Sequence, residues 1–276
     1  MWVFKGLIFD KHHAQLPTPI LIDDKIVMYY STKKNNLSTI GMFEVKVSNP
    51  FQKIKEDTEA LNLGEKGLFD DSGVMPSCII NKKNDLFLFY SGWNLKINIP
   101  YSHAIGISKI KKNGKLERIF SGPVLDRNID DPYLTNSPFV EFDKLKNKWI
   151  MYYCSGTHWS NNFPCYIIKK TESDNLFYWN NKKEIFIKHS QKNQAISRIC
   201  KDNNNFYYSF KTNKTNYSIF CKPFLKKPFK VNIVKNFWNS DMTCYPFILK
   251  YKNKKYMFFN GNNYGGTGIG FSEWIE

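Results

Sequence analysis

Arginine is scarce in this chain. It occurs only at Arg118, Arg127 and Arg198, which leaves 37 of the 40 basic residues as lysine. Only 24 residues are acidic, so the formal net charge is +16. Such a charge favours an acidic partner, but phosphate-reading surfaces rely on the planar fork of arginine. We therefore expect a solvated lysine surface that helps an anionic sugar or nucleotide-sugar approach, rather than a nucleic-acid site.

Several other features are missing. No apolar run approaches the roughly 18 residues that a membrane-spanning helix needs. The N-terminus lacks the basic start and long apolar stretch of a signal peptide, so we expect a cytoplasmic protein. No phosphate-loop or dinucleotide fingerprint is present and no loop has metal-ligand spacing, so we expect no cofactor and no metal site. No cysteines are spaced as CxxC; we expect reduced core residues at Cys78, Cys154, Cys165, Cys200, Cys221 and Cys244.

The clearest positive signal is an internal repeat. Five segments share one plan: a proline or small polar residue, a short apolar run, a polar turn, and an aromatic-rich run that ends in small or polar residues. They are Pro17–Thr32, Met75–Gly92, Ser137–Gly156, Ile196–Phe210 and Tyr245–Asn262. Each leads to a third apolar run, at 38–45, 102–110, 165–173, 216–224 and 266–274, and a variable fourth run follows, as at 116–122 and 184–190. Aromatic and β-branched runs bounded by Asn, Asp, Gly and Lys turns predict strands.

Four strands in each of five units predict an all-β fold, a single five-bladed β-propeller domain over residues 1–276. A β-sandwich is the alternative, but it does not require a five-fold recurrence. The segment 2–10 is expected to add a strand to the sheet formed by the C-terminal residues, because closing the ring removes exposed sheet edges.

In a propeller, the residues at the starts of the innermost strands face a central funnel. Paired carboxylates across such a cleft suit glycosyl transfer, where one protonates the leaving oxygen and the other attacks or activates water. Asp71 and Asp241 form the preferred catalytic pair, and Asp131 is the third candidate. Each of these aspartates also fits an ordinary turn that hydrogen-bonds backbone. Asp70 is expected to be a solvated or turn-capping neighbour.

Other residues near the strand ends are candidates for holding a sugar. Aromatic rings stack on sugar C–H faces, amides and histidines hydrogen-bond hydroxyls, and a guanidinium binds carboxylate or phosphate or orients a catalytic Asp. For Arg198 a structural salt bridge between blades is an equal alternative. The substrate-binding candidates are His13, Gln15, Trp93, His103, Asn136, His158, Trp159, Arg198, Tyr245, Asn262 and Tyr264. The glycine-rich stretch 260–270 is expected to be a tight hairpin whose backbone approaches the funnel.

Together these strings resemble the five-bladed propeller glycoside hydrolases of the arabinanase and invertase type. The resemblance rests on FDDSGVMPSCII, LFLFYSGWN, HAIGIS, SPFV with WIMYYCSGTHW, AISRI, and SDMTCYPFI with YMFFNGNNYGGTGIG, and it extends to relatives in bacterial surface-polysaccharide gene clusters. It implies a funnel active site for a glycoside or nucleotide-sugar, with Asp71 at the blade-two acid position. The chain departs from it on blade one, where His13 and Gln15 replace the usual Asp, and in lacking a convincing Glu general acid; Glu172 is a weak substitute.

The sequence therefore favours a glycosidase-like hydrolase or transglycosidase. A sugar-binding propeller without catalysis is the alternative, favoured by the missing blade-one Asp and the missing Glu. A nucleic-acid binder is a further alternative from charge alone, and it predicts oligonucleotide affinity that falls steeply with salt.

Overall fold

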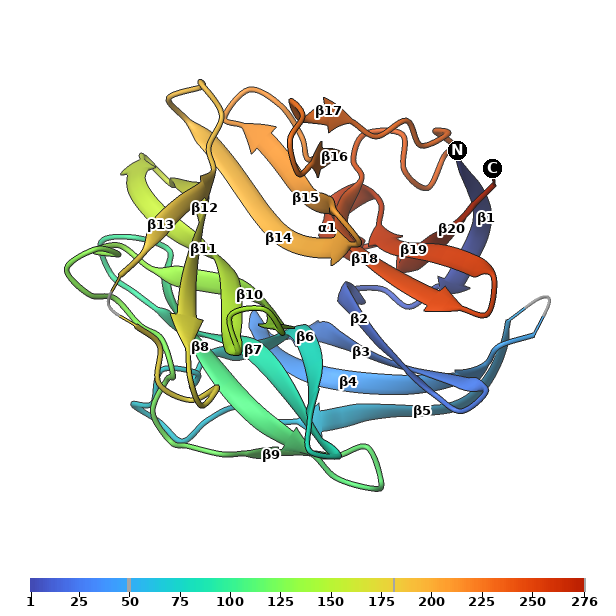
Figure 1. The fold of residues 1–276 in the computed structure, drawn as a ribbon, viewed down its shortest axis with the longest axis horizontal. Coiled ribbons are helices and arrows are strands. Elements are labelled where there is room, and N and C mark those ends of the chain that lie inside the picture. The colour runs from blue at the N-terminus through green and yellow to red at the C-terminus, as the bar shows by residue number, and fades with distance from the viewer. Residues whose placement is uncertain (49–50, 181, 276) are drawn as a thin grey trace.

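The computed structural model describes residues 1–48, 51–180 and 182–275 and is built almost entirely of β-strands (Figure 1). Antiparallel pairing groups the strands into five sets of four. A single parallel pairing, Ser38 with Gly73, joins the first set to the second, and another, Tyr166 with Ala195, joins the third to the fourth. The first set is β2 (Gln15–Ile22), β3 (Lys25–Lys34), β4 (Leu37–Lys46) and β5 (Gln52–Leu61). The second is β6 (Gly73–Lys82), β7 (Asp85–Leu95), β8 (Tyr101–Ile110) and β9 (Leu116–Arg118). The third is β10 (Thr135–Asp143), β11 (Lys148–Ser160), β12 (Phe163–Ser173) and β13 (Glu184–Ile187).

The last two sets complete the molecule. The fourth is β14 (Gln194–Asp202), β15 (Asn205–Thr212), β16 (Ser218–Pro223) and β17 (Phe229–Lys230). The fifth is β18 (Cys244–Tyr251), β19 (Lys254–Asn260), β20 (Ile269–Trp274) and, from the other end of the chain, β1 (Trp2–Phe9). Antiparallel pairing of β1 with β20 confirms the predicted junction of the two ends, which lie side by side in Figure 1. No helix among the described residues is long and apolar enough to cross a membrane.

The first strand of each set, called the inner strand from here on, touches the inner strands of two other sets. The contacts run from β2 to β6, β10, β14 and β18 and back to β2. The buried apolar residues form five clusters, one between each successive pair of sets around this ring. Each sheet therefore has apolar neighbours on both faces. This explains why second strands such as β3 and β7 are almost continuously apolar rather than alternating.

Four of the five inner strands contain a bulge at which two residues face one residue of the second strand. The first residue of each bulge has a left-handed backbone, with φ of 59° at Leu16, 48° at Ser137, 55° at Arg198 and 58° at Tyr245. A positive φ is uncommon outside glycine, and such residues concentrate where a fold re-aims side chains. In β6 the irregularity falls between Pro76 and Cys78, and Met75, which precedes Pro76, is not left-handed.

Arg198 ties three of these strands together. Its side chain is 1% exposed, and its guanidinium donates to the Pro17 carbonyl at 2.8 Å, to Thr18 Oγ1 at 2.7 Å and to the Pro76 carbonyl at 2.5 Å. It also lies over the Phe247 ring of β18, 5.8 Å from the centroid. Arg198 therefore joins neighbouring sets, but through backbone carbonyls and a hydroxyl rather than through the expected salt bridge.

The glycine-rich stretch is tighter than the predicted hairpin. It forms the single turn α1 (Asn262–Gly265), in which Asn263 and Tyr264 are left-handed. A Cβ at Gly265 would lie 2.6 Å from the Ala14 carbonyl, and one at Gly268 would lie 2.1 Å from that of Phe9. The backbone of this stretch thus closely approaches Phe9 and the segment before β2, whereas its predicted approach to the funnel stays a prediction.

We expect Arg198→Met to destabilise the fold strongly. The substitution removes the guanidinium donors to the buried Pro17 and Pro76 carbonyls, and each buried group left unsatisfied costs about 1–3 kcal/mol. Urea unfolding should therefore show a loss of about 3 kcal/mol or more, whereas Arg127→Met, at an exposed arginine, should change the stability by less than ~0.5 kcal/mol. A loss below about 1 kcal/mol for Arg198→Met would contradict the assigned role.

Candidate functional site

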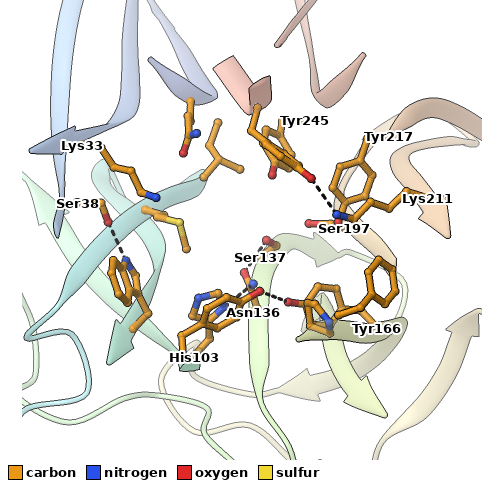
Figure 2. Close-up of a pocket in the computed structure, with 18 of the residues that line it drawn as sticks. Lys33, Ser38, His103, Asn136, Ser137, Tyr166, Ser197, Lys211, Tyr217 and Tyr245 are labelled. Atoms are coloured by element: carbon orange, nitrogen blue, oxygen red, sulfur yellow. Dashed lines mark hydrogen bonds between the residues drawn. The ribbon is translucent and has the colours of Figure 1, made fainter. Parts of the chain in front are cut away.

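A cavity of about 520 Å³ opens where the inner strands meet (Figure 2). Every inner strand contributes to its lining: Gln15 and Leu16 from β2, Met75 from β6, Asn136 and Ser137 from β10, Ser197 from β14, and Tyr245 from β18. Several of these stand at the bulges or directly before them. The left-handed backbone at Leu16, Ser137 and Tyr245 thus occurs where side chains are directed to the cavity.

The ends of the second strands supply another part of the lining. Lys33, Trp93 and Lys211 each stand two residues after a buried serine, in β3, β7 and β15 respectively. The remaining rings and polar groups come from the starts of third strands and from α1: Ser38, Tyr101, His103, Asn162, Phe163, Pro164, Tyr166, Tyr217 and Tyr264. Trp93 is fixed by a hydrogen bond from its indole Nε1 to Ser38 Oγ at 2.7 Å.

His103 is held in one form by Asn136. The Asn136 Oδ1 accepts from Ser91 Oγ and Ser137 Oγ, so its Nδ2 donates to His103 Nδ1 at 2.7 Å. Burial lowers the pKa of His103 to about 3, so the ring is neutral at pH 7. With Nδ1 accepting, the ring hydrogen lies on Nε2. Tyr101 stacks on this imidazole with centroids 4.5 Å apart.

Tyrosine hydroxyls and lysines dominate the polar chemistry of the cavity. The hydroxyls of Tyr101 and Tyr166 are 2.9 Å apart, and burial raises the pKa of both, so both are neutral at pH 7. Lys33 and Lys211 supply the positive charge. Among the described lining residues there is no aspartate and no glutamate. Across the part of the chain that the structure describes, no group of three or more His, Cys, Asp or Glu side chains is placed to hold a metal ion.

The structure brings six predicted substrate-binding residues into the lining: Gln15, Trp93, His103, Asn136, Tyr245 and Tyr264. The five others lie outside it. His13 is in the turn before β2, and the centroid of its ring lies 3.9 Å from the ring centroid of His12. His158 Nε2 bonds Asn193 Oδ1 at 3.1 Å, and Trp159 packs edge-on against Tyr101 at 5.3 Å.

Asn262 and Arg198 are the other two outside the lining. Asn262 Oδ1 accepts from the backbone N–H groups of Asp241 and Met242 at 3.0 and 3.1 Å, so Asn262 shapes the loop before β18. Arg198 is occupied by the backbone contacts described above. Neither side chain is among the residues that line this cavity.

Asp71 and Asp241 also lie outside the lining. Asp71 accepts from Gly67 N, Ser72 Oγ and Asn94 Nδ2 at 2.7–3.0 Å. Burial alone raises the pKa of Asp71, but these hydrogen bonds outweigh it and the pKa falls below its ordinary value. Asp71 is nevertheless a neighbour of the site, because Asn94 directly follows Trp93. Asp241 is exposed and borders a separate cavity between β17 and the loop before β18.

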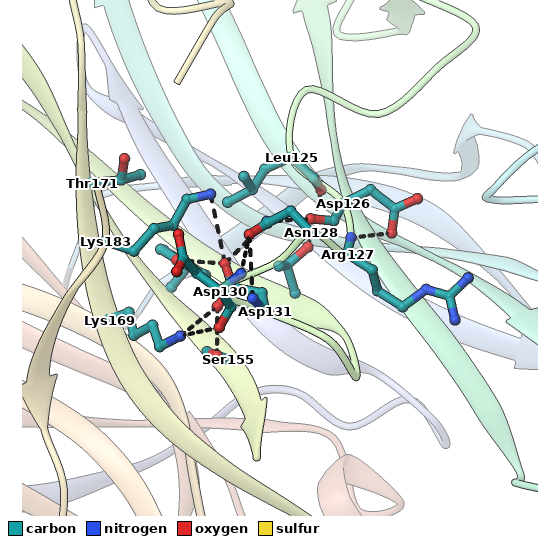
Figure 3. A network of polar contacts seen from close by, with 12 residues as sticks. Leu125, Asp126, Arg127, Asn128, Asp130, Asp131, Ser155, Lys169, Thr171 and Lys183 are labelled. Atoms are coloured by element: carbon teal, nitrogen blue, oxygen red, sulfur yellow. Dashed lines mark hydrogen bonds and ion pairs between the residues drawn. The ribbon is translucent and has the colours of Figure 1, made fainter. Parts of the chain in front are cut away.

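Asp131 is enclosed in a polar network away from the cavity (Figure 3). Its carboxylate is fully buried and accepts from Tyr153 OH at 2.9 Å and Ser155 Oγ at 2.6 Å. Lys169 Nζ lies 2.9 Å and Lys183 Nζ 3.6 Å from it. The structure thus uses Asp131 to anchor the third set, which differs from the catalytic role predicted for it.

Asp70 plays the same part in the second set. It is fully buried, accepts from Tyr90 OH at 3.1 Å and pairs with Arg118 Nε at 2.8 Å. The expectation of a solvated Asp70 is therefore wrong. In both sets, an aspartate before the inner strand accepts a hydrogen bond from a tyrosine of the second strand and pairs with a cation from a later strand of the same set. The tyrosine hydroxyl that the core buries is thereby satisfied.

The prediction missed the two cationic residues of the cavity. Lys33 and Lys211 lie near the ends of second strands, as Trp93 does. The predicted site residues from these regions are aromatic residues, His158 and Asn262, and include no lysine. The sequence did carry a signal for both lysines. Each stands two residues after a serine of the second strand, and Trp93 has the same position in its own strand. Tyr101 and Tyr166, at the starts of third strands, had no comparable signal.

We expect Asp131→Asn to destabilise the protein at neutral pH but not in acid. Burial by itself raises the pKa of Asp131. The hydrogen bonds from Ser155 and Lys169 and the charge of Lys169 outweigh this effect, so the pKa lies below its ordinary value. The stabilisation is therefore full above the unfolded-state pKa of about 4 and is lost as the pH falls through the folded-state value. Unfolding at pH 7 should show a loss of about 3–5 kcal/mol.

The exposed neighbour substitution Asp130→Asn is the matched control, with an expected change under ~0.5 kcal/mol. The difference between wild type and Asp131→Asn should shrink as the pH falls below about 4. An equal difference at pH 3 and pH 7 would contradict the ionic role of this carboxylate.

No family model matches the chain. Among curated proteins it is similar to two from Mycobacterium tuberculosis, "Uncharacterized protein MT1551" at 27% identity and "Uncharacterized protein Rv1502" at 26%, each over 283 residues that cover 96% of this chain and 94% of the relative.

Solved structures with a similar fold are glycoside hydrolases. A structure titled "Glycoside hydrolase" has a TM-score of 0.73 at 14% identity, covering 99% of this chain and 92% of that one. A thermostable family-43 glycoside hydrolase has a TM-score of 0.67 at 15% identity, covering 95% and 90%. A structure reported with the GH130 mannoside phosphorylases has a TM-score of 0.65 at 14% identity, covering 97% and 86%. The chain therefore has an all-β fold like that of these glycoside hydrolases.

Proposed function

We propose that the chain is a five-bladed β-propeller, one domain over residues 1–276, that takes a carbohydrate in its central cavity. Three observations support this architecture: the five four-strand sets, the ring of contacts between inner strands, and the pairing of β1 with β20. The fold likeness to glycoside hydrolases supports carbohydrate as the ligand class.

The composition of the cavity carries the proposal. Aromatic rings from several sets face one space of about 520 Å³, a size that suits a small ligand. Trp93, Tyr245 and Tyr264 line this space, and we infer that their rings stack on the C–H faces of a sugar. Gln15 and the neutral His103 offer groups that hydrogen-bond hydroxyls.

The chemistry at this cavity favours recognition over hydrolysis. Glycosidases use two carboxyl groups roughly 5–9.5 Å apart on either side of the bond that breaks. No described lining residue is acidic, and Asp131 is used in its own network. We therefore infer a sugar-binding propeller that lacks the paired-carboxylate reaction.

A glycosidase-like hydrolase or transglycosidase is the second candidate, favoured by the fold that the chain shares with glycoside hydrolases. It would need Asp71 to act from beside Trp93, with Asp241 as its partner. A nucleotide-sugar ligand, a place in surface-polysaccharide metabolism and a cytoplasmic location remain predictions from sequence.

We expect the protein to bind oligosaccharides saturably and Gln15→Ala to weaken that binding. A lost hydrogen bond is worth about 0.5–1.5 kcal/mol, which is roughly 2- to 12-fold in Kd. Isothermal titration calorimetry with a pool of oligosaccharides and nucleotide-sugars measures this. Gln191→Ala, at an exposed glutamine outside the lining, should leave the Kd unchanged.

Mass spectrometry of the same mixtures separates binding from turnover. The proposal expects no product from wild type. A product that wild type forms and Asp71→Asn does not would contradict the binding proposal and establish the hydrolase. A folded protein that binds no member of the pool would overturn a carbohydrate role.

A further inference from the structure

This inference rests on the proposed function and names the class of sugar. We propose that the carbohydrate carries an anionic group, a carboxylate or a phosphate, and that Lys211 with the Tyr264 hydroxyl binds this group at one side of the cavity.

Lys211 is held in place by aromatic rings. It is the penultimate residue of β15, and its Nζ donates to Tyr264 OH at 3.0 Å. The same Nζ lies 4.7 Å from the Tyr217 ring centroid, 5.1 Å from that of Tyr264 and 5.2 Å from that of Phe163. All four residues line the cavity. Cation–π contacts of this kind fix the ammonium without neutralising it.

Lys211 differs from most partly buried lysines of this protein. Most of these lysines face carboxylates, as Lys201 faces Glu141 at 2.6 Å and Lys169 faces Asp131 at 2.9 Å. Two others, Lys82 and Lys222, donate to backbone carbonyls. In the described part of the chain, no carboxylate forms an ion pair with Lys211. The sequence contains no acidic residue between Asp202 and Asp241. The charge of Lys211 is therefore available to a ligand.

The surroundings strengthen this positive field. Lys33 stands at the opposite side of the cavity in Figure 2. Arg198 directly follows the lining residue Ser197 and is buried among backbone carbonyls rather than carboxylates. Burial lowers the pKa of Arg198 to about 10, so it stays charged at pH 7.

A neutral sugar fits this end of the cavity poorly. A ligand that enters removes water from Lys211, and a charge that loses its water without gaining a partner is costly. A carboxylate or phosphate replaces the lost water with a charge-assisted hydrogen bond, which is about twice as strong as a neutral one. The Tyr264 hydroxyl, which accepts from Lys211, has its hydrogen left to donate to the same anion.

Calorimetry with matched sugars tests the inference. The probes are glucose, galactose and mannose, each compared with its uronic acid and its 6-phosphate, and inorganic phosphate alone. The wild type should bind at least one acidic sugar about tenfold or more tightly than its neutral counterpart. Lys211→Met should remove that difference, because the acidic sugar loses its charge-assisted hydrogen bond and the neutral sugar no longer desolvates an ammonium.

Lys214→Met is the matched control, because Lys214 is an exposed lysine three residues further along and should keep the full preference. Lys211→Gln, which keeps a hydrogen-bond donor and loses the charge, decides the matter if thermal unfolding shows that Lys211→Met is not folded. The uronic acids and the 6-phosphates distinguish a carboxylate ligand from a phosphate ligand.

Three outcomes would overturn the inference. Equal binding of neutral and acidic sugars would overturn it while keeping the proposed function. Lys211-dependent binding of inorganic phosphate, with no further gain from an attached sugar, would show an anion that is not part of the carbohydrate. Binding of none of the sugars by the folded protein would overturn the inference and the proposed function together.

Discussion

The structure depends on how its inner strands are held where they meet. Arg198 of β14 donates hydrogen bonds to the Pro17 carbonyl of β2 and to the Pro76 carbonyl of β6. The cost of burying an unpaired cation is offset by three acceptors and the Phe247 ring. Because the carbonyls belong to the irregular segments of their strands, one side chain fixes both the approach of the strands and their local backbone.

The same bulges explain why the cavity is lined as it is. A regular strand would turn alternate residues to either face of its sheet, into the apolar clusters between the sets. The left-handed residues break this alternation, and Ser137 and Tyr245 thereby face the cavity instead. The ends of the second strands then supply longer side chains, among them Trp93 and Lys211. The bulges therefore set both the backbone geometry of the inner strands and the side chains that line the cavity.

Much of the fold could be predicted from the sequence because the strand signal recurs five times. The aromatic-rich runs of the five repeated segments all form second strands, β3, β7, β11, β15 and β19. The predicted segment 2–10 supplies β1. The site was harder to predict. Gln15 and Asn136, directly before the bulges, belong to the inner strands that build the cavity. For this reason their predicted position facing the centre agrees with their place in the lining.

Residues a few positions earlier could not be assigned in the same way. Asp70 and Asp131 lie in turns that carry their carboxylates inward to a tyrosine hydroxyl, and nothing in the local sequence distinguishes this from a turn facing the funnel. Lys211 was missed for a different reason. Its aromatic surroundings come from Phe163, Tyr217 and Tyr264, which are brought together only by the fold.

The most direct test of a carbohydrate in the central cavity is a crystal structure of the protein with the sugar that calorimetry finds to bind most tightly. The account predicts the sugar ring in the cavity between Trp93 and Tyr245, with its acidic group within hydrogen-bond distance of Lys211 Nζ. A sugar bound on the outer surface beside Asp241, or a ring in the cavity with its acidic group turned away from Lys211, would contradict it.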